Sequence, residues 1–123
     1  MTNTEIEQVR GLLDRYILAT YLADDKTLRA CFHENAVMSG YLSGTLIVGD
    51  PEPFFEDISS MPSMESENIH YIGKIQSMSV TGSIAEAVIQ ETGFRGSTDL
   101  ENHFHLIKDR GRWKIISKCF TTL

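Results

Sequence analysis

The last segment of the chain, residues 100–120, constrains the fold most strongly. Two stretches rich in apolar, aromatic and β-branched residues flank the short segment Asp109-Arg110-Gly111, a pattern that is typical of a β-hairpin. Apolar residues occupy both alternating sets of positions along the two stretches. One set holds Phe104, Leu106, Trp113 and Ile115, and the other holds Ile107, Ile116 and Phe120. We therefore expect both faces of the hairpin to be covered, one by the chain's own helices and the other by a second subunit.

Length and charge limit the classes of function. A chain of 123 residues is expected to fold as one domain spanning residues 1–123. The net charge of -6 argues against a nucleic-acid partner, because such proteins carry basic surfaces. No apolar run approaches the length of a membrane span, and no polybasic segment predicts binding to a membrane surface.

The N-terminus and the cysteines predict the compartment. The first seven residues are polar and acidic, unlike a signal peptide. Cys31 and Cys119 show no close pairing and no metal-ligand spacing, so we expect both to be reduced and buried. The sequence therefore predicts a cytoplasmic protein.

Helices are expected early in the chain and strands late. Thr4 and Glu7 have the spacing of a capping box, and apolar residues at helical spacing follow it up to residue 20. A second helix is expected to start at Asp25 and to end at residues 33–35. The segment 50–52, Asp-Pro-Glu, predicts the start of a third helix. Strands are expected at residues 36–42, 45–48, 70–80 and 84–92 and in the final hairpin.

This order predicts an α+β domain with an antiparallel sheet. A strongly curved sheet with helices on its concave face forms a cone. The open end of such a cone is a natural pocket.

Two parts of the chain resemble a known superfamily. Residues 9–17, 23–25 and 31–37 are similar to the front half of the nuclear transport factor 2-like superfamily, and residues 106–118 are similar to its last hairpin. The combination is most similar to the SnoaL-like, putative lumazine-binding branch. The resemblance implies a cone-shaped α+β barrel with a cystatin-like fold. It also implies a homodimer formed through the outer face of the sheet.

The ketosteroid isomerase branch of this superfamily offers an enzymatic comparison. The resemblance places Tyr16 where that branch keeps its tyrosine. The catalytic base would fall near Gly40, where the sequence supplies no carboxylate. The second acid would fall at Asn102 or His103, and neither is an acid. We therefore expect no isomerase chemistry of that type.

Polar residues of the predicted strands suggest contacts inside the cone. Glu101, His103 and His105 alternate, so they share one face of a strand. A metal site there would need a further ligand such as Glu91, and we expect no metal and no cofactor. We rank contact of His103 with an organic ligand above a metal site. A third interpretation is structural: one of these residues is hydrogen-bonded in the core, and the others form a polar patch.

The predicted lining of the pocket combines these residues with others. Tyr16 is either a core residue or a hydroxyl handle for a ligand. Lys118 is either a cation at the pocket floor or a charge at the strand edge that reaches water. The full set of pocket candidates is Tyr16, Phe32, Met38, Phe54, Glu91, His103, His105, Lys118 and Phe120.

Two hypotheses follow from the sequence. The first is a protein that binds a small apolar or aromatic molecule, and this pocket could also host a lyase, cyclase or isomerase reaction. The second is a dimerisation scaffold whose cone is filled by side chains. We favour the pocket, because the predicted interior contains many polar residues for a sealed core.

Overall fold

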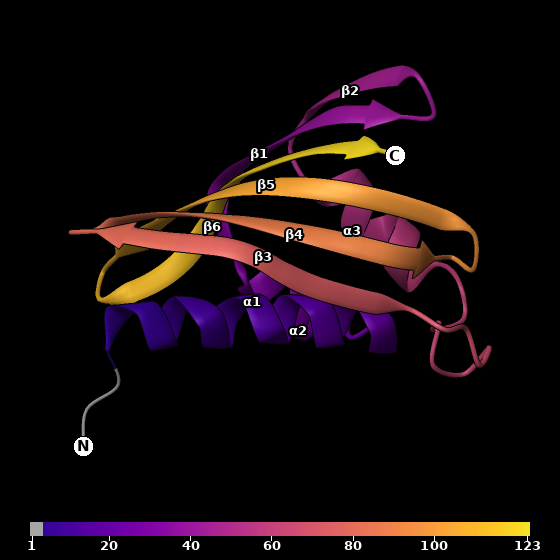
Figure 1. The fold of residues 1–123 in the computed structure, drawn as a ribbon, viewed down its shortest axis with the longest axis horizontal. Helices are drawn as coiled ribbons and strands as arrows, with labels where there is room; N and C mark the ends of the chain where they lie inside the picture. Colours follow the sequence, from indigo (N-terminus) through magenta and orange to yellow (C-terminus); the bar gives the residue numbers. More distant parts are fainter. Residues whose placement is uncertain (1–3) are drawn as a thin grey trace.

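A curved six-stranded sheet wraps around the helices in the computed structural model, which describes residues 4–123 (Figure 1). The strand order is β2-β1-β6-β5-β4-β3, and every neighbouring pair is antiparallel except β1 and β6, which are parallel. The predicted α+β class with an antiparallel sheet is confirmed. The elements are α1 (Glu5–Leu22), α2 (Asp25–Ala30), β1 (Phe32–Leu42), β2 (Thr45–Gly49), α3 (Glu52–Ser59), β3 (Ile72–Thr81), β4 (Ile84–Phe94), β5 (Thr98–Asp109) and β6 (Arg112–Thr122).

The helix α1 begins at the predicted capping box. Thr4 Oγ1 accepts a hydrogen bond from the Glu7 amide, and the Glu7 carboxylate accepts one from the Thr4 amide, both at 3.2 Å. The helix runs along the concave face of the sheet (Figure 1). It buries Val9, Leu12, Leu13 and Tyr16 there, because apolar residues at spacings of three and four share one side of a helix.

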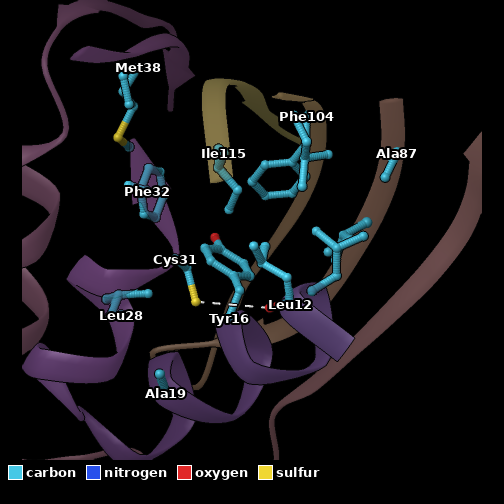
Figure 2. Close-up of a cluster of buried hydrophobic side chains, with 14 of the residues drawn as sticks. Leu12, Tyr16, Ala19, Leu28, Cys31, Phe32, Met38, Ala87, Phe104 and Ile115 are labelled. Carbon is cyan, nitrogen blue, oxygen red and sulfur yellow. Dashed lines mark hydrogen bonds between the residues drawn. The ribbon is translucent and has the colours of Figure 1, made fainter. Parts of the chain in front are cut away.

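The core lies between α1, α3 and the concave face of the sheet. The Tyr16 ring rises from α1 between Phe32 and Phe104 (Figure 2). Its centroid is 5.1 Å from that of Phe104 and 6.2 Å from that of Phe32. Phe54 of α3 lies 6.4 Å from both Tyr16 and Phe32. This aromatic cluster joins the first helix, the third helix and the sheet.

The strand β1 starts earlier than the sequence predicts. Residues 33–35 belong to β1 and do not end α2, which stops at Ala30. Phe32 is paired with Ile115 of β6, and the Ile115 amide donates a hydrogen bond to the Cys31 carbonyl at 2.9 Å. Pairing with β6 therefore sets the start of the strand, and this partner is remote in the sequence.

A β-bulge in β6 changes the expected facing of the final hairpin. His105 is paired with Ser117 and Leu106 with Ile115, so Ile116 is the extra residue. Beyond the bulge, Lys118 and Phe120 are buried like Ile115. The expectation that Phe120 lies on the opposite face from Ile115 is therefore wrong, because alternation of side chains restarts at the bulge.

The two-residue turn of this hairpin has the conformation that the sequence favours. Arg110 and Gly111 have φ angles of 53° and 77°, as a type I′ turn requires. The two cysteines are free, and Cys31 is buried as predicted. Cys119 is exposed, which corrects the expectation of burial, because it alternates with the inward-facing Lys118 and Phe120.

Candidate ligand-binding site

A pocket with a volume of about 420 Å³ lies between the β1–β2 hairpin, α3 and the ends of β4 and β6. The structure brings five of the predicted site residues to its wall. They are Met38, Phe54, Glu91, Lys118 and Phe120. The remaining wall is mostly apolar and includes Leu42, Ile47, Phe94 and Leu100.

Lys118 reaches the pocket because of the bulge in β6. In the parallel pairing of β1 with β6, Met38 is the partner of Lys118 and Gly40 is the partner of Phe120. Inward-facing residues of the two strands therefore meet at one corner of the pocket. Only 4% of the Lys118 surface is exposed.

Aromatic rings surround the Lys118 side chain. Its Nζ lies 3.8 Å from the centroid of Phe54, 5.3 Å from that of Phe120 and 5.6 Å from that of Tyr16. Within residues 4–123, no group accepts a hydrogen bond from Nζ, and no carboxylate forms an ion pair with it. Burial lowers the pKa of Lys118 to about 8, and the nearby Glu91 carboxylate acts in the opposite direction. The protein therefore places a primary amine of reduced basicity in an apolar pocket.

Glu91 is buried at the end of the inward-facing row of β4. Ala85, Ala87 and Ile89 precede it on the same face of the strand and are buried too. Tyr71 Oη donates to Glu91 Oε2 at 2.7 Å, and Asn102 Nδ2 donates to Oε1 at 2.6 Å. Both carboxylate oxygens thus have donors, as a buried carboxyl group requires.

Tyr16 completes this network from α1. Its hydroxyl lies 3.5 Å from Glu91 Oε1, so the contact is longer than that of Tyr71. Burial raises the pKa of the Tyr16 phenol well above its usual value, and the Glu91 charge adds to the effect. The same two causes raise the pKa of Tyr71. Both tyrosines are therefore protonated donors that hold the carboxylate.

The other predicted residues lie away from the pocket. Tyr16 and Phe32 are packed in the core behind its wall. His103 and His105 are exposed on the opposite, outer face of β5. His103 Nε2 lies 2.7 Å from Glu101 Oε2, and this contact lowers the pKa of Glu101. The two histidines are therefore placed together, but they do not face Lys118 and Glu91.

Sequence reasoning did not assign Tyr71 and Asn102 to the network around Glu91. Asn102 shares its strand face with Leu100 and Phe104, and all three are buried. This apolar alternation marks an inward position, so a signal for Asn102 was present in the sequence. Tyr71 lies just before β3, where no periodicity indicates its direction. Its contact with Glu91 depends on the pairing of β3 with β4.

A wider groove of about 770 Å³ lies on the other side of α1, next to α2 and the β5–β6 turn. Arg15, Lys26 and Arg112 on its rim are exposed. The Cys31 thiol lines this groove and is buried, and its sulfur lies 3.9 Å from the Leu12 carbonyl oxygen (Figure 2). Burial raises the pKa of this thiol. The groove is thus a poorer candidate site than the pocket at Lys118, which contains two buried ionisable groups.

Two further features bear on the class of site. Across residues 4–123, no cluster of three or more His, Cys, Asp or Glu side chains is arranged to hold a metal ion. None of the helices in this part of the chain is both long enough and apolar enough to cross a membrane.

Several solved structures share this fold. A protein of unknown function from Silicibacter pomeroyi has a TM-score of 0.86 at 22% identity, and the match covers 100% of each chain. One from Shewanella baltica has a TM-score of 0.82 at 23% identity, covering 99% of this chain and 98% of that chain. Both are described as nuclear transport factor 2-like. A ketosteroid isomerase-like protein from Erwinia carotovora has a TM-score of 0.70 at 17% identity, covering 99% and 98%.

The comparison of sequences gives the family. No curated protein matches the chain. The family model described as "Putative lumazine-binding" matches residues 4–121, which is nearly the whole chain. The nuclear transport factor 2-like fold and this match together show that the chain belongs to the putative lumazine-binding family.

Proposed function

We propose that the protein binds a small, largely apolar organic molecule in the pocket at Lys118. The observation that carries the proposal is the buried Lys118 amine at the pocket wall, for which residues 4–123 supply no hydrogen-bond acceptor. A buried amine without a partner costs free energy, because it loses its contacts with water. A ligand oxygen next to Nζ would restore such a contact.

The pocket also favours a particular kind of ligand. A volume of about 420 Å³ lies within the range of ordinary small-molecule sites. The Phe54 and Phe120 rings offer flat apolar contacts, and Lys118 and Glu91 supply a donor and an acceptor. A flat aromatic heterocycle with at least one oxygen fits this chemistry. The family description, putative lumazine-binding, makes lumazine a reasonable first probe.

The alternative is a scaffold whose cone is filled by side chains. Core packing of Tyr16, Phe32 and Phe104 supports it for the inner part of the cone. A filled cone does not explain an uncompensated lysine, because a leucine or methionine there would pack without loss of hydration. The binding function therefore explains the buried Lys118 better than the scaffold hypothesis does.

Binding is tested by thermal shift and calorimetry with lumazine, related aromatic heterocycles and small lactones. We expect at least one compound to raise the Tm of the wild type and to bind Lys118→Met about tenfold more weakly, which corresponds to one lost polar contact. His103→Ala is the matched control, because His103 lies on the outer face. The proposal fails if no compound binds, or if Lys118→Met binds every compound as well as the wild type does.

We also propose that the chain forms a homodimer through the outer face of its sheet. Large apolar side chains on the outer side of β1 and β2 are exposed in a single chain, and a second copy would remove them from water. Ile107 and Ile116, which support this expectation in the sequence, are half-buried on the same face. The exposed apolar side chains on the outer side of β1 and β2 are Val37, Tyr41, Leu46 and Val48.

A further inference from the structure

We propose that Lys118 forms an imine with an aldehyde or ketone carbonyl of the molecule that occupies the pocket. The inference rests on the proposed binding function and names the substrate class of the same site. It assigns a covalent step to a side chain that would otherwise only orient a ligand.

The surroundings of Nζ leave the amine available. Only a neutral amine attacks a carbonyl carbon, so a nucleophilic lysine must not be held as an ammonium ion by a carboxylate. Glu91 is the acidic side chain that influences Lys118, yet its oxygens already accept from Tyr71, Asn102 and Tyr16. No ion pair joins Glu91 to Lys118 in the described chain. The pKa of about 8 agrees with this geometry, since half of the amine is neutral at that pH.

The other described lysines differ in their surroundings. Lys108 Nζ contacts Glu5 Oε1, and Lys114 Nζ donates to the Ala30 carbonyl, each at 2.5 Å. Lys26 and Lys74 are exposed to solvent. Of the lysines in the described chain, Lys118 alone combines burial, a surrounding of aromatic rings and a position on the wall of the Lys118 pocket. This combination is the one that activates lysines by desolvation.

The step balances without a redox partner. The Nζ lone pair forms a bond to the carbonyl carbon, and the π electrons of the carbonyl move to its oxygen. Both protons of the neutral amine then leave with that oxygen as water, and a carbon–nitrogen double bond remains. A protonated imine draws electrons from the adjacent bond, which suits a lyase reaction.

Reductive trapping tests the inference. The wild type is incubated at pH near 7.5 with naphthaldehyde and cyanoborohydride, and modified peptides are identified by mass spectrometry. The expected modification adds to Lys118 the mass of the aldehyde minus one oxygen, because imine formation loses one water and reduction returns two hydrogens. The neutral fraction at this pH is on the order of a hundredfold larger for Lys118 than for an ordinary lysine. We therefore expect labelling of Lys118 at least about tenfold faster than labelling of the exposed Lys74.

Controls separate this inference from the binding function. Lys118→Arg keeps a positive charge but cannot form an imine, so its adduct at residue 118 must vanish, whereas Lys74→Arg must be labelled at Lys118 as before. Naphthalenemethanol, which has the same rings and no carbonyl, must slow the labelling. If this alcohol binds in the pocket and Lys118 is labelled no faster than Lys74, imine formation is disproved and the binding function stands. If neither compound binds and no selective adduct forms, both are disproved.

Discussion

Lys118 Nζ lies 3.8 Å from the centre of the Phe54 ring. This contact joins the last strand, β6, to the third helix, α3, across the pocket. The contact exists because the bulge at Ile116 turns Lys118 inward. An ammonium group over a ring gains a favourable cation–π interaction, but it loses its hydration at the same time. This loss of hydration lowers the pKa of Lys118, and the charge of Glu91 acts in the opposite direction.

The first prediction concerns stability against pH. Burial lowers the pKa of Lys118 from 10.5 to about 8, so between these values the folded chain binds fewer protons than the unfolded chain. The free energy of unfolding therefore rises with pH across this interval. At pH 7 the buried charge opposes folding by up to about 3 kcal/mol.

Lys118→Met should consequently be more stable than the wild type at pH 7, and its advantage should shrink between pH 8 and 10.5. Urea unfolding at a series of pH values measures both quantities. A variant that is less stable than the wild type at every pH would show that Lys118 is not a desolvated cation.

The second prediction concerns the donors to Glu91. Tyr71 donates at 2.7 Å and Tyr16 lies at 3.5 Å. Tyr71→Phe should lower the free energy of unfolding by about 1.5–3 kcal/mol, as expected for a hydrogen bond to a charged group. Tyr16→Phe should cost less, because its contact is long. Chemical denaturation checks the order, with Tyr21→Phe as the control, because Tyr21 stacks on Tyr71 and its hydroxyl makes no hydrogen bond within residues 4–123. Equal costs for Tyr71→Phe and Tyr21→Phe would show that the bond to Glu91 does not stabilise the fold.

The third prediction concerns Gly40, which β1 places opposite Phe120. Its φ angle is 152°, and an added Cβ would lie 1.9 Å from the Phe120 carbonyl oxygen. Gly40→Ala must therefore separate β1 from β6, at a cost of about 3 kcal/mol or more. Gly44 also has a positive φ, of 86°, but no atom lies within 4 Å of its added Cβ. Gly44→Ala should cost only about 1–2 kcal/mol, and thermal unfolding compares the two variants.

The fourth prediction concerns assembly. Val37→Asp places a charge on the outer face of β1, where 48% of the valine surface is exposed in a single chain. The variant should sediment as a monomer at a concentration where the wild type is a dimer, because a buried unpaired charge destabilises an interface. Leu18→Asp is the control, since Leu18 is exposed on α1, away from the sheet's outer face. A wild type that sediments as a monomer would overturn the proposed dimer.

Local signals in the sequence predict much of the fold. The capping box at Thr4, the helical stripe that follows it and the turn at Gly111 depend on nearby residues, so they are readable without a structure. The bulge at Ile116 depends on the pairing of β6 with β5 and with β1. No local pattern reveals it, and the facing of Lys118 and Phe120 depends on it.

Some residues of the candidate site could likewise be predicted from local sequence patterns, and others depend on contacts between distant segments. Met38, Phe54 and Glu91 lie at the pocket wall, as their apolar or strand positions suggest. His103 and His105 lie on the outer face because they alternate with Phe104, which is buried. The sequence contains this alternation, but which set faces inward is decided by packing against α1. The network at Glu91 joins residues from four segments, and only the folded chain brings them together.

Nuclear magnetic resonance of isotope-labelled lysine measures whether the pocket contains a buried amine of lowered basicity. The Cε resonance of each lysine is followed as the pH rises, and Lys118→Met identifies the signal of residue 118. The expected midpoint of the Lys118 signal lies near pH 8, well below the ordinary lysine value of about 10.4. A Lys118 midpoint at the ordinary lysine value would show that burial does not reduce the basicity of this amine.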